Sequence, residues 1–134
     1  MEIQIINHKS KWLSAVQNLG DTASSTVGFL AREVYSDYAR KGHILVATDG
    51  EQLLAYIMFR YKKNCIVIVH LCVDPKHRGQ GIPSQMLDYL IEQNKEYVSH
   101  IQLACRRDYK LEKFWQTLGF SAVAEKTGRA TKER

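Results

Sequence analysis

A short glycine-containing loop lies between an apolar strand and a helix near the middle of the chain. The strand ends at residues 73–75, glycines follow as Gly79 and Gly81, and a helix is predicted to begin at Pro83. Glycines let the backbone approach a ligand closely, and a helix N-terminus offers unpaired amide hydrogens to phosphate oxygens. Arg78 adds a permanent cation that can make charge-assisted hydrogen bonds to phosphate. The pattern predicts a phosphate-holding loop, although the two glycines alone would also suit a tight turn.

One side chain in the strand before this loop has a pKa range near neutrality. It is His70, and an imidazole suits the role of a general base. Strict alternation of side chains along a strand predicts that His70 points to the opposite face from Val67 and Val69. A structural histidine, bonded to a neighbouring element, is the alternative that this pattern favours.

A polar cluster at residues 106–109 follows the next predicted strand. Ligands gather at the strand ends of such sheets, so Asp108 and Tyr109 are candidates to face one. A solvated loop is the alternative that the sequence leaves open for these residues. Further along the chain, the aromatic side chains of Phe114 and Trp115 are expected to pack a helix against the sheet.

The three cysteines lie among apolar, strand-like residues, and their spacing matches no zinc pattern. Cys65 and Cys72 are therefore expected to be buried, reduced thiols, and no metal site is predicted. Cys105 could instead be a nucleophile, because Arg106 beside it would lower its pKa. No histidine or lysine lies within four residues to serve as its base.

The composition is that of one globular domain. The 134 residues are 45% hydrophobic and 25% charged, and no apolar run approaches the ~20 residues that a membrane helix needs. No signal-peptide pattern is found at the N-terminus, so a cytoplasmic location is expected by default. The net charge of +5 favours an anionic partner such as a nucleotide cofactor. Nucleic acid is a minor alternative, because no arginine-rich tract with interleaved aromatics is present.

Hydrophobic periodicity predicts the elements that position these residues. Strands are expected at residues 3–6, 43–48, 53–61, 65–73, 100–105 and 120–124. Helices are expected at 9–19 with a stop at Gly20, from the Asp21-Thr22 cap to Gly42, at 83–97 and at 111–118. The order β-αα-βββ-α-β-α-β predicts an α/β (α+β) fold with a mixed sheet and helices on both faces. Residues 1–128 would form the single domain and 129–134 a polar basic tail.

The loop and the element order resemble those of the GNAT superfamily of acetyl-CoA-dependent N-acetyltransferases. The coenzyme A loop of that family reads Gln/Arg-x-x-Gly-x-Gly/Ala after a Val-x-Pro turn. Here Arg78 fills the first position, Gly81 the glycine and Pro83 the last position. Residues 114–120 are similar to a second family segment, aromatic-aromatic-x-x-x-Gly-Phe. The resemblance covers nearly the whole chain.

The resemblance implies direct transfer of an acetyl group from acetyl-CoA to an amine on a small molecule or a protein. It implies that backbone groups near the end of the central strand pair with the pantetheine arm, and that an amide there polarises the thioester carbonyl. Loop amides would hold the pyrophosphate, with the Ser84 hydroxyl compensating for the amide that Pro83 lacks. The implied cofactor contacts are Leu71, Cys72, Val73, Arg78, Gly79, Gln80, Gly81, Ile82, Pro83, Ser84, Asp108 and Trp115.

The family pattern fails at the residues that would move protons. Its acid is commonly a tyrosine, where this chain has Trp115, and Tyr109 is the nearest replacement in sequence. Its base often comes from positions that correspond to Val67 or Val69, which leaves His70 as the candidate. These departures keep open the alternative of a non-catalytic acyl-CoA-binding or interaction domain.

Two further expectations concern the acceptor side and the chain end. Glu33, Tyr35 and Asp37 lie on the helical region that in relatives helps to form the acceptor site, although a solvated helix face is favoured for them here. Family members normally close the sheet with a strand after the one near Phe120, where this chain has only its polar tail. The final strand is therefore expected to be missing, or supplied by a second copy or a further domain that completes the exposed edge.

Overall fold

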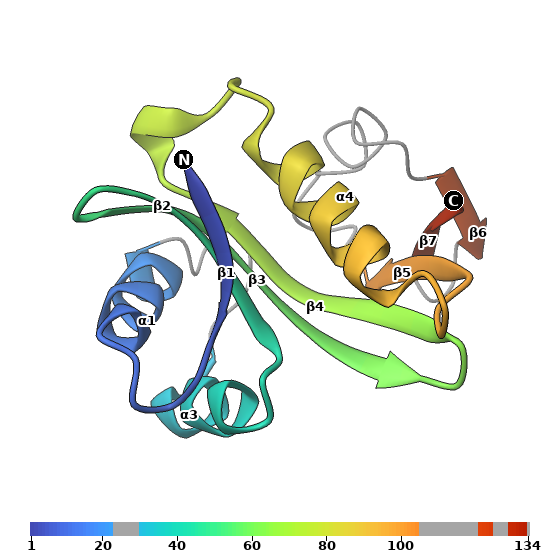
Figure 1. The fold of residues 1–134 in the computed structure, drawn as a ribbon, viewed down its shortest axis with the longest axis horizontal. Coiled ribbons are helices and arrows are strands. Elements are labelled where there is room, and N and C mark those ends of the chain that lie inside the picture. Colours follow the sequence, from blue (N-terminus) through green and yellow to red (C-terminus); the bar gives the residue numbers. More distant parts are fainter. Residues whose placement is uncertain (23–29, 105–120, 125–128, 134) are drawn as a thin grey trace.

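Seven strands form one mixed sheet in the computed structural model, which describes residues 1–22, 30–104, 121–124 and 129–133 (Figure 1). The strand order is β1-β2-β3-β4-β5-β7-β6, and β4–β5 is the parallel pair among antiparallel ones. The strands are β1 (Glu2–Ile6), β2 (Ile44–Asp49), β3 (Gln52–Lys62), β4 (Cys65–Val73), β5 (His100–Ala104), β6 (Ser121–Ala124) and β7 (Arg129–Glu133). The helices are α1 (Trp12–Thr22), α3 (Arg32–Arg40) and α4 (Ile82–Asn94). The predicted mixed sheet is confirmed.

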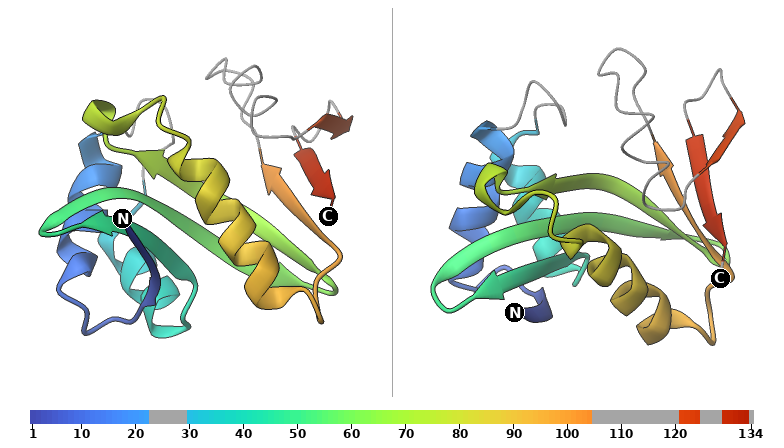
Figure 2. Two further views of the ribbon diagram at one scale, coloured as in Figure 1. Left: turned by 45° about the horizontal axis from the view of Figure 1, so that its top comes forward. Right: turned by 90° about the horizontal axis from the view of Figure 1, so that it is seen from above.

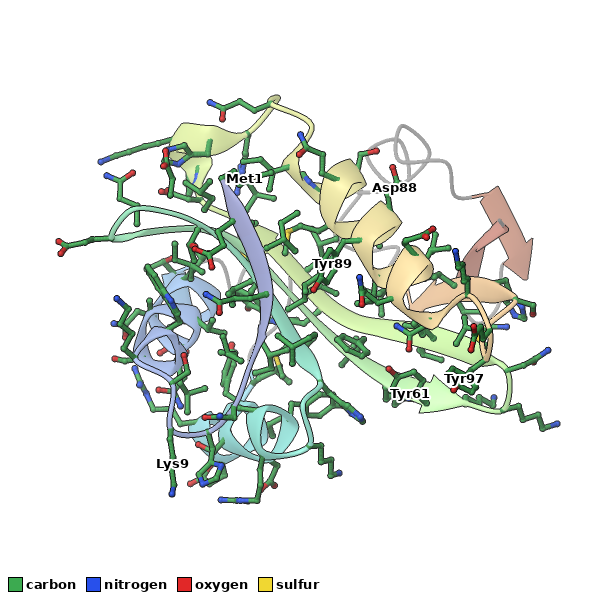
Figure 3. All side chains as sticks on the ribbon, in the orientation of Figure 1. Met1, Lys9, Tyr61, Asp88, Tyr89 and Tyr97 are labelled. Carbon is green, nitrogen blue, oxygen red and sulfur yellow. The ribbon has the colours of Figure 1, made fainter. Side chains whose placement is uncertain are left out.

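The sheet separates two hydrophobic cores. On one face α4 buries Met86, Leu87 and Leu90 against the strands, with Tyr89 at the margin (Figure 3). On the other face lie α1 and α3, which bury Val16, Tyr35 and Ala39 (Figure 2). Because successive side chains of a strand point to opposite faces, β3 supplies both cores in turn. Its contributions are Ile57 and Phe59 on the α4 side, and Tyr56 and Met58 on the other.

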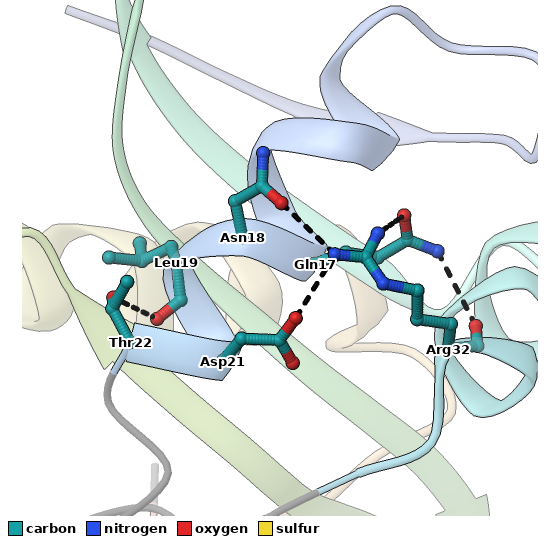
Figure 4. A network of polar contacts seen from close by, with 6 residues as sticks. All are labelled: Gln17, Asn18, Leu19, Asp21, Thr22 and Arg32. Carbon is teal, nitrogen blue, oxygen red and sulfur yellow. Dashed lines mark hydrogen bonds and ion pairs between the residues drawn. The ribbon is translucent and has the colours of Figure 1, made fainter.

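Arg32 is the first residue of α3, and its side chain links this helix to the last turns of α1 (Figure 4). Its guanidinium donates hydrogen bonds to Gln17 Oε1 at 3.0 Å, Asn18 Oδ1 at 3.1 Å and Asp21 Oδ2 at 3.1 Å. The side chain is 55% exposed, and an exposed ion pair by itself stabilises little. Because one guanidinium donates to three acceptors, the start of α3 is nevertheless held against the end of α1.

The helix bounds differ from their predictions, since α1 covers residues 12–22 instead of 9–19 and α4 covers 82–94 instead of 83–97. The first helix does not stop at Gly20 but continues to Thr22, and Gly20 is buried inside it. The hydroxyls of Tyr35 and Tyr56 lie where a side chain at position 20 would be, so this glycine provides space and not a helix end. Helix α4 begins at Ile82, one residue earlier than expected. Burial of the Ile82 side chain in the core outweighs the steric bias towards extended backbone before a proline.

The expected polar tail is a strand of the sheet. Residues Arg129–Glu133 form β7, which lies between β5 and β6 and is antiparallel to both. The prediction that the final strand is missing or comes from a partner is therefore wrong. Ladder hydrogen bonds come from the backbone, so a strand with a neighbour on each side can form from polar residues that show no hydrophobic pattern. The helix predicted at 111–118 lies outside the described residues.

Candidate active site

Strands β4 and β5 pair over only part of their length. The parallel ladder joins Cys65–Ile68 to His100–Leu103, and beyond it the two strands diverge (Figure 2). Strand β4 continues to Val73 and remains paired with β3 along this stretch. In the described part of the chain, the β4 edge that faces β5 is therefore open from position 69 onwards. An extended ligand can add to such an edge as an extra strand.

The register of β3 with β4 decides which backbone groups reach this open edge. The Asp74 amide donates to the Leu54 carbonyl at 2.8 Å, so Asp74 points its backbone groups towards β3. Alternation along an antiparallel pair directs those of Cys72 to β3 as well. Leu71 and Val73 consequently present their N–H and C=O groups to the opening. Among the three predicted pantetheine contacts, Cys72 is the one that the register does not bring to the edge.

The Asp74 carboxylate shapes the turn that follows β4. It accepts a hydrogen bond from the Lys76 amide at 3.3 Å and lies 3.2 Å from Nδ1 of His77. Residues Pro75–His77 form a single 3₁₀ turn capped by this carboxylate. The turn carries the chain from the end of β4 directly to Arg78 and the glycine loop.

Both loop glycines have left-handed backbone conformations. The φ angle is +78° at Gly79 and +74° at Gly81. Non-glycine residues rarely adopt this conformation. In the described chain, no atom beyond the adjacent residues lies within 4 Å of the position that a Cβ would take at either glycine. The sequence therefore needs glycine here for its backbone freedom and not for space. Gly79, Gln80 and Gly81 are exposed, as is the Arg78 side chain.

The loop ends at the N-terminus of α4, with Gly81 as the N-cap. Amides in the first turn of a helix have no intrahelical acceptor, which here leaves those of Ile82 and Ser84 available. Pro83 lacks an amide hydrogen, and the Gln85 amide already donates to the Gly81 carbonyl at 3.2 Å. The side chains of Ile82 and Pro83 are buried, so these two residues anchor the loop. Exposed amides, the positive end of a helix and Arg78 together favour an anionic group.

The prediction for the orientation of His70 is wrong. Met58 pairs with His70 and Phe59 with Ile68, so Val69 is the extra residue of a β-bulge. A bulge shifts the alternation that follows it by one residue. His70 therefore lies on the α1/α3 face of the sheet, the face to which Val67 also points. Single-sequence periodicity carries no signal for this shift, because the bulge is defined by pairing with β3.

His70 is bonded to a neighbouring strand, as the structural alternative expected. Its Nδ1 lies 2.8 Å from the Tyr56 hydroxyl, and both residues are buried. Tyr35 completes the group, with its ring centroid 6.3 Å from each of theirs. Burial raises the pKa of Tyr56 far above its ordinary value and also raises the pKa of Tyr35. Both tyrosines therefore keep their hydroxyl protons near neutral pH.

Sequence reasoning missed Tyr56 and placed Tyr35 on a solvated helix face. Tyr35 is fully buried, whereas Glu33 and Asp37 are exposed as expected. The helical spacing from Tyr35 to buried Ala39 was a signal for an inward position. No comparable signal identifies Tyr56, because its partner is set by the strand register.

The described cysteines, Cys65 and Cys72, are buried thiols, as predicted. Burial raises the pKa of the Cys72 thiol to about 11, with Arg78 opposing the shift and Asp74 adding to it. Cys72 is therefore a thiol and not a nucleophilic thiolate near neutral pH. Cys105, Asp108, Tyr109 and Trp115 lie outside the described residues, and their predicted roles stay predictions. Over residues 1–22, 30–104, 121–124 and 129–133, no group of three metal-ligating side chains is found.

The acetyltransferase (GNAT) domain family has a model that matches residues 17–131 of the chain. The chain belongs to this family. It is accordingly an acetyltransferase-family domain. A comparison with curated proteins found no match. In the described part of this GNAT domain, no helix is both long and apolar enough to cross a membrane.

Solved structures of acetyltransferases share the fold. Ard1 from Thermoplasma volcanium is 19% identical, with 97% of this chain and 93% of that chain covered and a TM-score of 0.77. The PaiA N-acetyltransferase from Thermoplasma acidophilum, solved with coenzyme A, is 14% identical, with coverages of 99% and 98% and a TM-score of 0.74. N-acetylglutamate synthase from Neisseria gonorrhoeae, solved with coenzyme A and N-acetyl-glutamate, is 12% identical. The match covers 98% of this chain but 34% of that one, with a TM-score of 0.80.

Proposed function

We propose that this GNAT domain transfers the acetyl group of acetyl-CoA directly to an amine on a small molecule or a protein. The observation that carries the proposal is the continuity of the open β4 edge with the glycine loop and the N-terminus of α4. Leu71 and Val73 offer hydrogen bonds to an extended amide-containing arm, and the loop follows within a few residues. An extended pantetheine arm that ends in a pyrophosphate has this same sequence of chemical groups.

In the proposed complex the pyrophosphate lies on loop and helix amides, with Arg78 as its cation. The amides are those of Gly79, Gln80, Gly81, Ile82 and Ser84. The pantetheine arm adds to β4, and its thioester reaches the bulge where β4 and β5 separate. The acceptor amine attacks the carbonyl carbon, the C–N bond forms and the C–S bond breaks. The amine gives up one proton, and the departing thiolate takes one. Backbone amides at the open edge support the developing oxyanion.

The groups that move these protons are part of the proposal. His70 lies at the bulge, next to the expected position of the thioester, and is the described candidate. Tyr109 remains the proposed donor to the thiolate, in the place that the family pattern gives to a tyrosine. The alternative of a non-catalytic acyl-CoA-binding domain is favoured by one observation. His70 is 4% exposed and already hydrogen-bonded, unlike a base that is open to substrate.

Calorimetry with acetyl-CoA tests the cofactor half of the proposal. Arg78→Ala is expected to weaken binding by roughly 10-fold or more, because a hydrogen bond to a charged group contributes about 1.5–3 kcal/mol. Arg60→Ala is the matched control, since Arg60 is exposed on β3 at the end of the sheet away from the loop. The affinity of the Arg60→Ala variant for acetyl-CoA should equal that of the wild type.

Thiol release across a panel of amines tests the chemical half. Turnover that falls in Arg78→Ala, with an unchanged melting temperature, supports the acetyltransferase. No binding at millimolar acetyl-CoA would refute the proposal. Binding without thiol release for any amine would support the acyl-CoA-binding alternative instead.

A further inference from the structure

The glycine loop between β4 and α4 is anchored at both ends (Figure 1). At its start, the Asp74 amide donates to the Leu54 carbonyl of β3 at 2.8 Å. At its end, the side chains of Ile82 and Pro83 are buried. Residues 78–81 between these anchors are exposed, and glycine restricts the backbone less than any other residue does. The conformation of the loop must therefore be fixed by contacts at its ends.

Asp74 contacts the turn that follows it through both its backbone and its side chain. Its Oδ1 accepts a hydrogen bond from the Lys76 amide at 3.3 Å, and its Oδ2 lies 3.2 Å from Nδ1 of His77. The Asp74 carbonyl accepts from the His77 amide at 2.8 Å. Arg78 leaves this turn with an extended backbone, at φ −71° and ψ 153°. The side chains of Asp74 and His77 are 28% and 22% exposed, so their contact is partly shielded from water.

The charge of Asp74 by itself does not favour an anionic ligand. The carboxylate is in the turn directly before a loop that is proposed to hold a pyrophosphate, and like charges repel. A carboxylate at this place is better explained by the contacts that it makes than by its charge. Aspartate is among the preferred capping residues, because its oxygens accept hydrogen bonds from amides in the first turn.

We propose that Asp74, held in place by His77, is a positioning residue that orders the glycine loop for the pyrophosphate before acetyl-CoA binds. The proposal rests on the proposed function, which places the pyrophosphate on this loop. A loop that is already ordered does not lose conformational freedom on binding, and this strengthens the affinity. Without the Asp74 contacts, only a fraction of the molecules would have a loop that can bind, and the apparent affinity would fall by that fraction.

Position and charge predict opposite effects for substitutions of Asp74. Charge alone predicts that Asp74→Ala binds acetyl-CoA more tightly. Positioning predicts that Asp74→Ala weakens the binding by roughly 5- to 10-fold, the equivalent of one lost capping hydrogen bond. Asp74→Asn keeps an oxygen for the Lys76 amide, and its amide group can still hydrogen-bond the His77 ring. This variant should bind acetyl-CoA at least as tightly as the wild type, and calorimetry measures all three affinities.

A truncated donor separates positioning of the loop from a general loss of structure. S-acetylpantetheine carries the thioester and the pantetheine arm but no pyrophosphate. For acetyl-CoA, kcat/KM of Asp74→Ala should fall by the same factor as the affinity. For S-acetylpantetheine, kcat/KM should equal that of the wild type, because this donor does not use the loop. Thiol release with an amine that the wild type acetylates measures both, and equal losses with the two donors would contradict the positioning role.

His77→Phe tests whether His77 and Asp74 act as a pair. The variant keeps an aromatic ring but lacks Nδ1, so it should weaken acetyl-CoA binding by roughly 2- to 5-fold, the effect of one ordinary hydrogen bond. Asp74→Ala already lacks this contact, so adding His77→Phe to it should have little further effect. Glu96→Ala is the control for net charge, since Glu96 is exposed and follows the end of α4 that lies away from the loop. Its affinity for acetyl-CoA should equal that of the wild type.

The outcomes distinguish this proposal from the proposed function. If the wild type binds acetyl-CoA and Asp74→Ala binds it equally well or more tightly, the positioning role is refuted while the function stands. Equal impairment of Asp74→Asn and Asp74→Ala would also refute it, because asparagine keeps the capping oxygen. Absence of acetyl-CoA binding to the wild type would refute both proposals. If Asp74→Ala does not fold, His77→Phe decides the question, and an unchanged affinity in that variant would count against the pair.

Discussion

His43 shows how the surroundings of one residue couple folding to pH. It precedes β2 and stacks on Phe59 at a centroid distance of 5.4 Å, with Tyr61 and Tyr38 edge-on at 5.3 and 6.3 Å. Burial lowers the pKa of His43, and the nearby Lys41 ammonium lowers it further. The folded protein therefore favours the neutral imidazole.

The free energy of unfolding should decrease as the pH falls through about 6.5, the ordinary pKa of histidine. Below this pH the unfolded chain binds a proton at residue 43 more readily than the folded chain does. The stability that the neutral imidazole contributes is thus fully present above the pKa of His43 in the unfolded chain. It is lost as the pH falls towards the lower pKa of His43 in the folded protein. Urea unfolding at several pH values between 5 and 8 measures it.

His43→Gln is the control for this prediction, because glutamine is neutral throughout the range. The variant should lose less stability than the wild type between pH 7.5 and pH 5. Identical pH dependence in the two proteins would contradict the role given to His43.

At the scale of elements, α1 depends on a glycine to approach the sheet. Gly20 lies in the last turns of α1, beneath the hydroxyls of Tyr35 and Tyr56. A Cβ at this position would be 2.6 Å from the Tyr56 oxygen and would also collide with that of Tyr35. The gain in helix propensity that alanine normally brings is therefore opposed by overpacking.

Gly20→Ala should lower the free energy of unfolding by about 1–3 kcal/mol, the usual cost of overpacking a core. In a protein that also carries Tyr35→Phe, which removes one colliding oxygen, Gly20→Ala should lower the free energy of unfolding by less. Denaturant unfolding of the four proteins in this double-mutant cycle measures the coupling. Ser14→Ala, on an exposed position of α1, is the control and should change little. A Gly20→Ala protein as stable as the wild type would show that the packing described here is wrong.

At the scale of the whole molecule, the last strand of the chain helps to keep the open edge of β4 in place. The opening along β4 exists because β5 turns away from it, and β5 is held on its other side by β7. Strand β7 is in turn flanked by β6, so its backbone has neighbours on both sides. A segment with a polar sequence thus completes the sheet within the chain.

Thr131→Pro should destabilise the protein. Thr131 lies opposite Gln102 of β5 and Ser121 of β6, so its amide has a ladder partner on one side or the other. Proline has no amide hydrogen, so the partner carbonyl loses its hydrogen bond. An unsatisfied carbonyl should lower the free energy of unfolding by about 1–3 kcal/mol. Thermal unfolding measures the loss, and Thr131→Val, which keeps both the amide and the β-branched side chain, is the control. Equal melting temperatures for the proline variant and the wild type would mean that β7 does not hold the sheet.

The sequence alone determined the features whose causes are local. The Arg78 loop, the two glycines and the start of α4 follow from backbone freedom and helix ends, which depend on a few adjacent residues. The order of strands and helices follows from periodicity, and β4 matches its predicted bounds of 65–73. These features were enough to predict the family.

Only the tertiary structure decided the features that depend on strand pairing. The bulge at Val69 sets the face of His70, the register joins His70 to Tyr56, and two neighbouring strands make β7 from a polar segment. Each of these outcomes depends on residues far apart in the chain, and a period of two along one strand does not contain that information. The glycine loop before α4 could therefore be predicted, whereas the surroundings of His70 could not.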